Sequence, residues 1–88
     1  MALRLRLYIA GNGPNSQRAV TNLRAICAEH FQDDCKLEIV DLLMHPARAL
    51  ADRVVVTPTL IRLRPGPEAR AIGNLSDTAQ LLLMLGQG

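Results

Sequence analysis

The sequence predicts an α/β fold in which a four-stranded mixed sheet is combined with helices in the order β-α-β-α-β-β-α. Near the start of the chain, aliphatic residues alternate with arginine or tyrosine, which is typical of a strand with one buried face. In residues 16–31, apolar residues recur at helical spacing. In the second half, a Pro-Gly turn separates two strand-like segments, which predicts a hairpin.

Two strands and one helix are expected in the first half of the chain. Residues 3–9 alternate in hydropathy, so we expect a strand whose second face is wetter. Residues 16–31 have the spacing of an amphipathic helix, with Asn15 or Ser16 as the N-cap. Residues 36–42, "KLEIVDL", are expected to form the second strand.

The second half is expected to hold a short helix, a hairpin and a last helix. In "MHPARALAD", Pro46 fits the first helical position and His45 lies near the cap. Residues 59–64 are expected to form the third strand, and "ARAIG" returns antiparallel to it after the turn "PGPE". The last helix is expected to begin at the N-cap Ser76 and to end at Gly86.

The order of these elements fixes the topology of the sheet. A β-α-β unit is parallel and right-handed, whereas two strands joined by a short turn form an antiparallel hairpin. Together they give a sheet of the thioredoxin-like kind. We expect residues 1–88 to form a single domain.

Composition and charge exclude several classes of function. The net charge is +2 with basic residues scattered along the chain, and only one Tyr and one Phe are present, which is not typical of nucleic-acid binding. Arg4 and Arg6 interrupt the apolar N-terminus, so it lacks a signal-peptide core. The longest apolar run, 81–85, is too short to span a bilayer. We therefore expect a cytoplasmic protein with no membrane partner.

The segment 10–16, "AGNGPNS", has the position of a phosphate-binding or redox loop but the chemistry of neither. The Lys-Ser/Thr pair of a P-loop is missing, and Pro14 interrupts a near match to the dinucleotide fingerprint. A thioredoxin carries C-G-P-C here, whereas this chain reads N-G-P-N. The pair Thr57-Pro58 matches the cis-proline landmark of that fold. Asn12, Pro14 and Pro58 are therefore assigned to the fold, and no catalytic residue is assigned.

The two cysteines have separate expected environments. Cys27 lies on the apolar side of the expected helix, where a buried, inert thiol is expected. Cys35 follows an acidic turn and is expected to be partly exposed. A disulfide between them stays open as an alternative. With His30 and His45 they lack zinc-site spacing, so neither a metal nor another cofactor is expected.

Three segments together resemble the KaiB family, the small component of the bacterial circadian clock. They are "LRLYIAGNGPNSQRAVTNL", "IVDLLMHPARALADRVVVTPTLIRLRP" and "RAIGNLSD", and they cover nearly the whole chain. The resemblance implies a non-enzymatic protein that binds the ATPase ring of KaiC and, in complete clocks, sequesters KaiA there. The thioredoxin-like sensor domain of clock histidine kinases is similar, which makes such a kinase a further candidate partner.

The resemblance also implies two folds, a thioredoxin-like monomer and a tetramer with a rearranged C-terminal half. In this chain "LLLML" favours the final helix, and Met84 stands where relatives that switch readily carry glycine. The sequence given ends at Gly88, without the longer acidic tail of the clock proteins. Both departures favour the thioredoxin-like state as the resident one.

The resemblance carries over a set of partner contacts, residue by residue. The short helix and its flanks supply five of them and more distant basic positions supply three: Pro46, Arg48, Leu50, Asp52, Arg53, Arg18, Arg62 and Arg70. For each arginine the competing interpretation is a solvated charge. For Leu50 it is core packing, which we favour at this stage.

Two other functions stay open beside binding to a KaiC-like ATPase. One is a thioredoxin-like redox protein using Cys35 or Cys27. The other is a homo-oligomeric scaffold, a dimer or tetramer, in which a sheet edge or the face carrying Arg4 and Arg6 pairs with a second copy.

Overall fold

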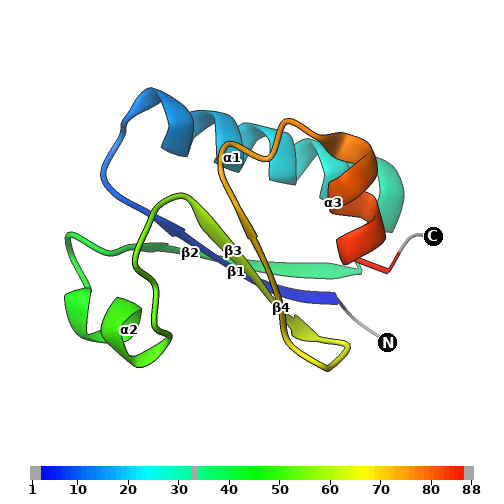
Figure 1. Cartoon of the computed structure of the whole chain (residues 1–88). Coiled ribbons are helices and arrows are strands. Elements are labelled where there is room, and N and C mark those ends of the chain that lie inside the picture. Colours follow the sequence, from blue (N-terminus) through cyan, green and yellow to red (C-terminus); the bar gives the residue numbers. More distant parts are fainter. Residues whose placement is uncertain (1–2, 33, 87–88) are drawn as a thin grey trace.

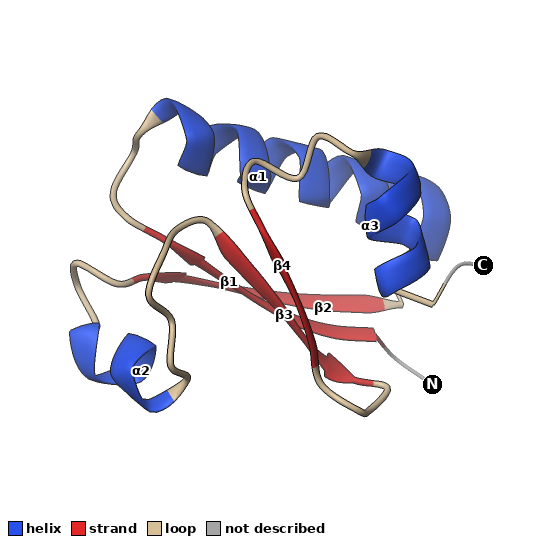
Figure 2. Cartoon of the chain, in the orientation of Figure 1, coloured by secondary structure: helices blue, strands red, loops and turns tan. Residues whose placement is uncertain are grey.

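The computed structural model describes residues 3–32 and 34–86. Within them, four strands form one sheet in the order β2-β1-β3-β4 (Figures 1 and 2). The elements are, in chain order, β1 (Leu3–Ile9), α1 (Pro14–Ile26), the π-helix η1 (Cys27–Phe31), β2 (Cys35–Asp41), α2 (Pro46–Ala51), β3 (Thr59–Arg64), β4 (Ala69–Ile72) and α3 (Thr78–Met84).

The sheet is mixed, as predicted. β1 lies at its centre and pairs in parallel with β2, with Leu7 opposite Ile39. On its other side β1 pairs antiparallel with β3, and β3 forms the predicted hairpin with β4, with Leu60 opposite Ala71. The parallel pair requires a crossover connection, which α1 and η1 provide.

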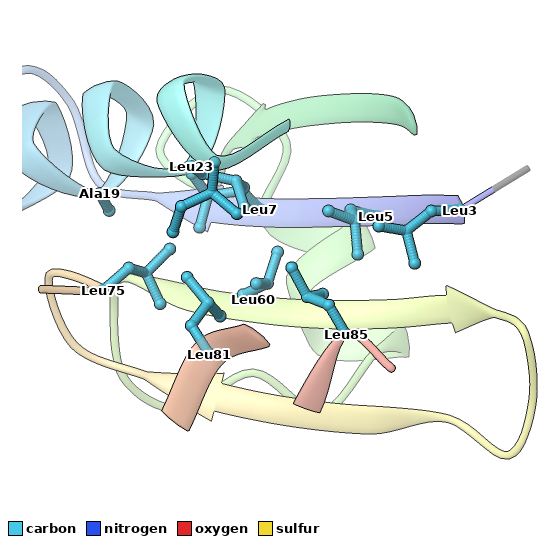
Figure 3. Packing of buried hydrophobic residues seen from close by; sticks show 10 residues of the cluster. Leu3, Leu5, Leu7, Ala19, Leu23, Leu60, Leu75, Leu81 and Leu85 are labelled. Atoms are coloured by element: carbon cyan, nitrogen blue, oxygen red, sulfur yellow. The ribbon is translucent and has the colours of Figure 1, made fainter. Parts of the chain in front are cut away.

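The helices cover the two faces of the sheet unequally. α1 and α3 lie over one face, whereas α2 lies alone on the other side, near one end of the strands (Figure 2). The face below α1 and α3 holds the larger core, whose side chains converge from β1, β3 and the two helices (Figure 3). This core contains Leu3, Leu5, Leu7, Ala19, Leu23, Ile26, Leu60, Leu75, Leu81 and Leu85.

The second face of β1 is less wet than the sequence predicts. Tyr8 is fully buried, in a smaller cluster with Val40, Ala49 and Ile61. The prediction failed at this position because a phenol can be buried when its hydroxyl finds partners. Here α2 supplies those partners, and it lies far from Tyr8 in the sequence.

The predicted helix over 16–31 is confirmed in its body and wrong at its start. α1 begins at Pro14, and its N-cap is Gly13 rather than Asn15 or Ser16. The physical reason is that proline lacks an N–H and has a fixed φ, which suits the first helical position. Ser16 is instead buried, and its Oγ accepts a hydrogen bond from the backbone N–H of Ala10 at 3.5 Å.

The end of this helix widens into the π-helical turn η1 and stops at Gln32, which has a left-handed φ of 42°. The second strand begins at Cys35 and ends at Asp41, one residue earlier at each end than the predicted 36–42. Residue 33, part of the acidic turn expected there, lies outside the described residues.

The N-cap of the last helix also lies one residue later than predicted. Asp77, not Ser76, is the N-cap of α3, and its carboxylate accepts a hydrogen bond from the N–H of Gln80 at 3.2 Å. Both residue types are good caps, so their order in the sequence could not decide between them. Gly86 follows the helix with a φ of +94°, which fits the predicted stop.

Two further features bear on the predicted roles. The Thr57-Pro58 peptide is cis, as the fold predicts, and Pro58 is buried. No helix in residues 3–32 and 34–86 is long and apolar enough to cross a membrane.

Candidate partner-binding surface

Five of the predicted contact residues lie on α2 or just beyond it. The helix has only six residues, and Pro46 occupies its first turn, preceded by His45, whose side chain makes no capping hydrogen bond. Among its residues Ala49 is buried, against Tyr8, Val40 and Ile61 of the sheet. Because one alanine is the main inward contact, most of the surface of α2 faces solvent.

An exposed apolar surface surrounds α2, and we call it the α2 patch. Its members come from the turn before α2, from α2 itself and from the segment after it: Leu43, Met44, Leu50, Val55 and Val56, which are 67, 72, 81, 90 and 45% exposed. The last three of them line one open hollow of about 370 Å³ together with Pro46 and Ala49.

The interpretation of Leu50 as a core residue is wrong. Its side chain is 81% exposed because the neighbouring Ala49 occupies the inward position of this short helix. The remaining members of the α2 patch were missed, since "VVV" at 54–56 has the composition of a buried strand. Only Val54 of the three is partly buried against the smaller cluster. The proline at 58 marks the end of this non-strand segment.

A network of charged and phenolic groups, the α2 network, attaches α2 to the sheet. Arg6 Nε lies 2.8 Å from Glu38 Oε1, and Arg6 Nη1 lies 2.9 Å from Asp52 Oδ2. Arg48 Nη2 lies 2.9 Å from Glu38 Oε2. The Tyr8 hydroxyl makes a short hydrogen bond to Asp52 Oδ2 and also lies 3.0 Å from the backbone oxygen of Arg48. Arg48 and Asp52 are therefore engaged within the molecule.

The charges of the α2 network shift the pKa values of its members. For Glu38, the hydrogen bond from Arg6 is the main cause that holds the carboxyl pKa below its ordinary value. For Asp52, burial pushes the pKa up, but hydrogen bonds from Tyr8 and Arg6 outweigh it and leave the pKa lowered. Burial and the bond to Asp52 raise the pKa of Tyr8. The network thus favours ionised carboxylates and a neutral phenol.

Arg70 reaches the same site from β4. Its guanidinium donates to the backbone oxygens of Asp52 and Arg53, the latter at 3.4 Å, and also contacts Glu68 Oε1 at 3.1 Å. A cation at this position satisfies carbonyls at the end of α2 and suits the negative end of the helix. Arg53 itself is exposed, with a left-handed φ of 56°. The structure therefore brings Arg53 and Arg70 together with α2.

Arg18 and Arg62 lie elsewhere. Arg18 is exposed on α1, which covers the opposite face of the sheet. Arg62 is half-buried and binds α3: Nη1 donates to the backbone oxygen of Met84, and Nη2 donates to that of Pro67 at 2.8 Å. The structure does not bring these two arginines to the α2 patch.

The loop between β1 and α1 is held by Asp41, at the end of the neighbouring strand. One carboxylate oxygen of Asp41 accepts from the N–H of Gly11 at 3.1 Å and from the N–H of Leu43 at 2.9 Å. Gly11 has a φ of +66°, which glycine adopts readily. In the part of the chain that the structure describes, no three His, Cys, Asp or Glu side chains gather as a metal site.

The two cysteines do not lie near the loop where a thioredoxin keeps its sulfurs. Cys27 begins η1 and Cys35 begins β2, and both are half-buried. This confirms the partly exposed thiol expected at Cys35, whereas the fully buried thiol expected at Cys27 is wrong. The loop tetrapeptide 12–15 opens α1, so the thirteen-residue helix separates it from the thiols by about 20 Å. The thiols therefore cannot serve the loop.

Comparisons with known sequences match this chain to the KaiB family. The sequence model of the KaiB domain matches residues 6–87. The circadian clock protein KaiB3 of Synechocystis is 47% identical over 81 residues, which are 92% of this chain and 79% of that protein. A circadian clock oscillator protein KaiB of Prochlorococcus marinus is 44% identical over 81 residues, covering 92% of this chain and 69% of the relative.

Solved structures show the same fold. The N-terminal domain of SasA from Synechococcus elongatus superposes with a TM-score of 0.79 at 28% identity and covers 100% of this chain and 87% of that one. Trxlp from Edwardsiella tarda gives 0.78, also at 28% identity, over 94% and 82% of the two chains. Chloroplastic thioredoxin z reaches 0.80 at 20% identity over 98% and 77%, a likeness of fold alone.

Proposed function

Because this chain belongs to the KaiB family, we propose that it is a non-enzymatic protein that binds the ATPase ring of a KaiC-type protein. The role is in circadian timing or a related stress response. The observation that carries the proposal is the α2 patch, in which five large apolar side chains are 45–90% exposed around one short helix. Gathered apolar side chains of this size are typical of a protein interface.

The arrangement around α2 suits docking on a partner. The exposed side chain of Leu50 projects from a helix that the α2 network holds on the sheet, so little ordering is required on binding. Arg53 follows α2 and is exposed beside the α2 patch. An apolar centre with a charged rim is the usual anatomy of a specific interface. We assign Leu50 and Arg53 the main contact roles and Pro46 a lesser one.

Arg48, Asp52 and Arg70 are proposed to support this surface rather than to make its strongest contacts. Each already has partners within the molecule, so its side chain is less available to a binding partner than that of Arg53. Arg62 is proposed to hold α3, and Arg18 to be a solvated charge on the far side.

The test is binding of this protein to a hexameric KaiC-type ATPase, with ATP and with ADP, measured by size exclusion with mass determination. We expect a complex whose mass corresponds to the ATPase hexamer with a ring of single copies of this protein bound to it. The amount of this complex should depend on the nucleotide. Leu50→Ala is expected to weaken binding by about tenfold or more, because truncating a central anchor typically costs over 1 kcal/mol. Arg53→Glu is expected to weaken it as well, by reversing a rim charge.

A matched control exists on the other side of the molecule. Leu83 on α3 is 66% exposed, similar to Leu50, but lies away from α2. Leu83→Ala should leave binding within about twofold of the native protein. Equal binding by the Leu50 and Leu83 variants would refute the surface, and the absence of any complex in both nucleotide states would refute the function.

The same mass measurement bears on the other candidate partners. When the mass of the protein alone is measured over a range of concentrations, a dimer or tetramer is detected directly. A KaiA-like protein or the thioredoxin-like domain of a clock sensor kinase can then be added to the preformed complex, and a change in mass shows recruitment or displacement.

A further inference from the structure

We propose that Cys27 and Cys35 form a reversible intramolecular disulfide, a modification site that joins the end of the first helix to the start of β2 when the protein meets a low-molecular-weight disulfide. The two residues come from η1 and β2, and their sulfur atoms lie 2.7 Å apart, with one thiol donating a hydrogen bond to the other. This proposal is independent of binding to a KaiC-type ring.

The geometry needs little adjustment for a bond to form. A disulfide brings its sulfur atoms to about 2.05 Å, so the two thiols have to approach by less than about 1 Å. The segment between them contains the π-helical turn η1 and Gln32, which has a left-handed backbone conformation. The backbone therefore holds both thiols facing each other in the reduced protein.

The thiols are accessible to a small reagent. Both are half-buried, and they line an open surface hollow with Arg24, Ala28 and Leu37. Arg24 precedes Cys27 by three residues on α1, so the two side chains lie on the same side of the helix. Its cationic side chain suits the carboxylates of an anionic peptide disulfide such as glutathione disulfide.

The reaction balances with glutathione disulfide as the oxidant. The thiolate of Cys27 attacks one sulfur of the reagent, forming a mixed disulfide and releasing one glutathione thiolate, which takes up a proton. Cys35 then gives its proton to water and attacks the Cys27 sulfur, releasing the second glutathione. Two protein thiols are oxidised and one glutathione disulfide is reduced to two thiols.

The environment of Cys35 sets the order of these steps. Burial, with the hydrogen bond and the charge of Cys27 next, raises the pKa of Cys35 to about 12. Cys35 therefore carries little thiolate at neutral pH and acts second, once Cys27 no longer bears a charge. Thiol exchange proceeds through the thiolate, so the first attack falls to Cys27.

The test exposes the reduced native protein to mixtures of reduced and oxidised glutathione and measures intact mass and free thiols. We expect the mass to fall by two hydrogen atoms and both thiols to disappear together, without covalent dimers. Closing the loop from Cys27 to Cys35 should raise Tm by about 5–15 °C over the reduced form, by restricting the unfolded chain.

Two single variants separate the roles of the thiols. Cys35→Ser should accumulate a mixed disulfide, with the added mass of one glutathione on Cys27, because no second thiol can release it. Cys27→Ser should react more slowly than Cys35→Ser, since burial, the main cause of the raised pKa of Cys35, persists in the variant. The double serine variant should show the reduced Tm under all conditions, which controls for any effect of glutathione on the fold.

Three results would overturn the proposal. They are two glutathione adducts on the native protein, a covalent dimer on a non-reducing gel, or both thiols remaining free in oxidised glutathione. Binding to a KaiC-type ring is a separate readout, since the seven-residue strand β2 places the cysteine pair about 20 Å from the start of the turn that leads to α2. A failure of either experiment therefore leaves the other interpretable.

Discussion

The two faces of the sheet are held by different interactions. Below α1 and α3, ten buried residues, mostly leucine, form the larger core (Figure 3). Beside α2, four of the described residues form the smaller buried cluster, next to the ion pairs and hydrogen bonds of the α2 network. β1 contributes to both, because Leu5 and Leu7 face the larger core while Arg6 and Tyr8 face α2.

This difference means that one face of the sheet provides most of the stability, whereas the other face carries the exposed surface around α2. Burial of apolar area stabilises by about 25 cal/mol per Å², so the larger core supplies most of the stability. α2 buries little apolar area, and directional contacts from Arg6 and Tyr8 fix its orientation instead. A helix held in this way can keep Leu50 exposed, whereas a helix held by its own apolar face would have to bury it.

The largest expected effect on the free energy of unfolding comes from truncating, one at a time, two neighbouring side chains of β3. Leu60 and Ile61 are neighbours, 0 and 1% exposed, but Leu60 faces the larger core and Ile61 faces α2. Leu60→Ala should cost about 3–5 kcal/mol in the free energy of unfolding, and Ile61→Ala about 2–3 kcal/mol, because Ile61 packs in a smaller cluster of buried side chains. Urea unfolding measures both, and a larger cost for Ile61→Ala would contradict the comparison.

A smaller effect is expected from removing one hydroxyl of the α2 network. Tyr8→Phe keeps the ring in the smaller cluster but removes the bonds to Asp52 and to the backbone oxygen of Arg48. It should cost about 1–2 kcal/mol and speed hydrogen exchange in α2 while leaving α1 unchanged.

The control for this variant is the same substitution in an Asp52→Asn background. If the hydroxyl acts through Asp52, the cost of Tyr8→Phe should be smaller there than in the native protein. An equal cost in both backgrounds, or equal acceleration of exchange over α1 and α2, would show that the hydroxyl does not hold α2 in particular.

The larger core is also the region that the sequence predicts well. Alternation in residues 3–9, helical spacing after the first loop and the hairpin around "PGPE" were enough to give the order of the elements along the chain and the mixed sheet. These signals are local and periodic, so they can be recognised in the sequence without knowing which residues make tertiary contacts. The errors there are small shifts at the ends of elements: Gly13 and Asp77 are the N-caps of α1 and α3, and β2 begins and ends one residue early.

The α2 side could be predicted only in part. Its contact residues came from a family resemblance, which named Arg62 and Arg18 alongside Arg53 although the fold separates them. The α2 network joins residues up to 46 positions apart, and no periodicity in the chain marks such pairs. Likewise, the apolar character of Leu50 does not reveal which way a six-residue helix turns it.

The smallest expected effect is a dependence of stability on acid that comes from the two carboxylates of the α2 network. The pKa values of Asp52 and Glu38 lie below their ordinary values of 3.8 and 4.5, so the folded state binds fewer protons than the unfolded chain as the pH falls through this range. The stabilisation by these carboxylates is therefore present above their ordinary pKa values and lost as the pH falls through the lowered ones. Urea midpoints should be flat from pH 7 to about 5 and decline below that.

The double variant Asp52→Asn, Glu38→Gln should be less stable at pH 7 but should decline less in acid, since its amides bind no protons in this range. Leu60→Ala, in contrast, should keep the native decline, because the larger core contains no carboxylate. Each exposed ion pair contributes only ~0–1 kcal/mol, so the difference in slope, rather than the stability at one pH, is the quantity to measure. Equal declines in the native protein and the double variant would mean that α2 is held on the sheet by apolar contacts, as α1 and α3 are.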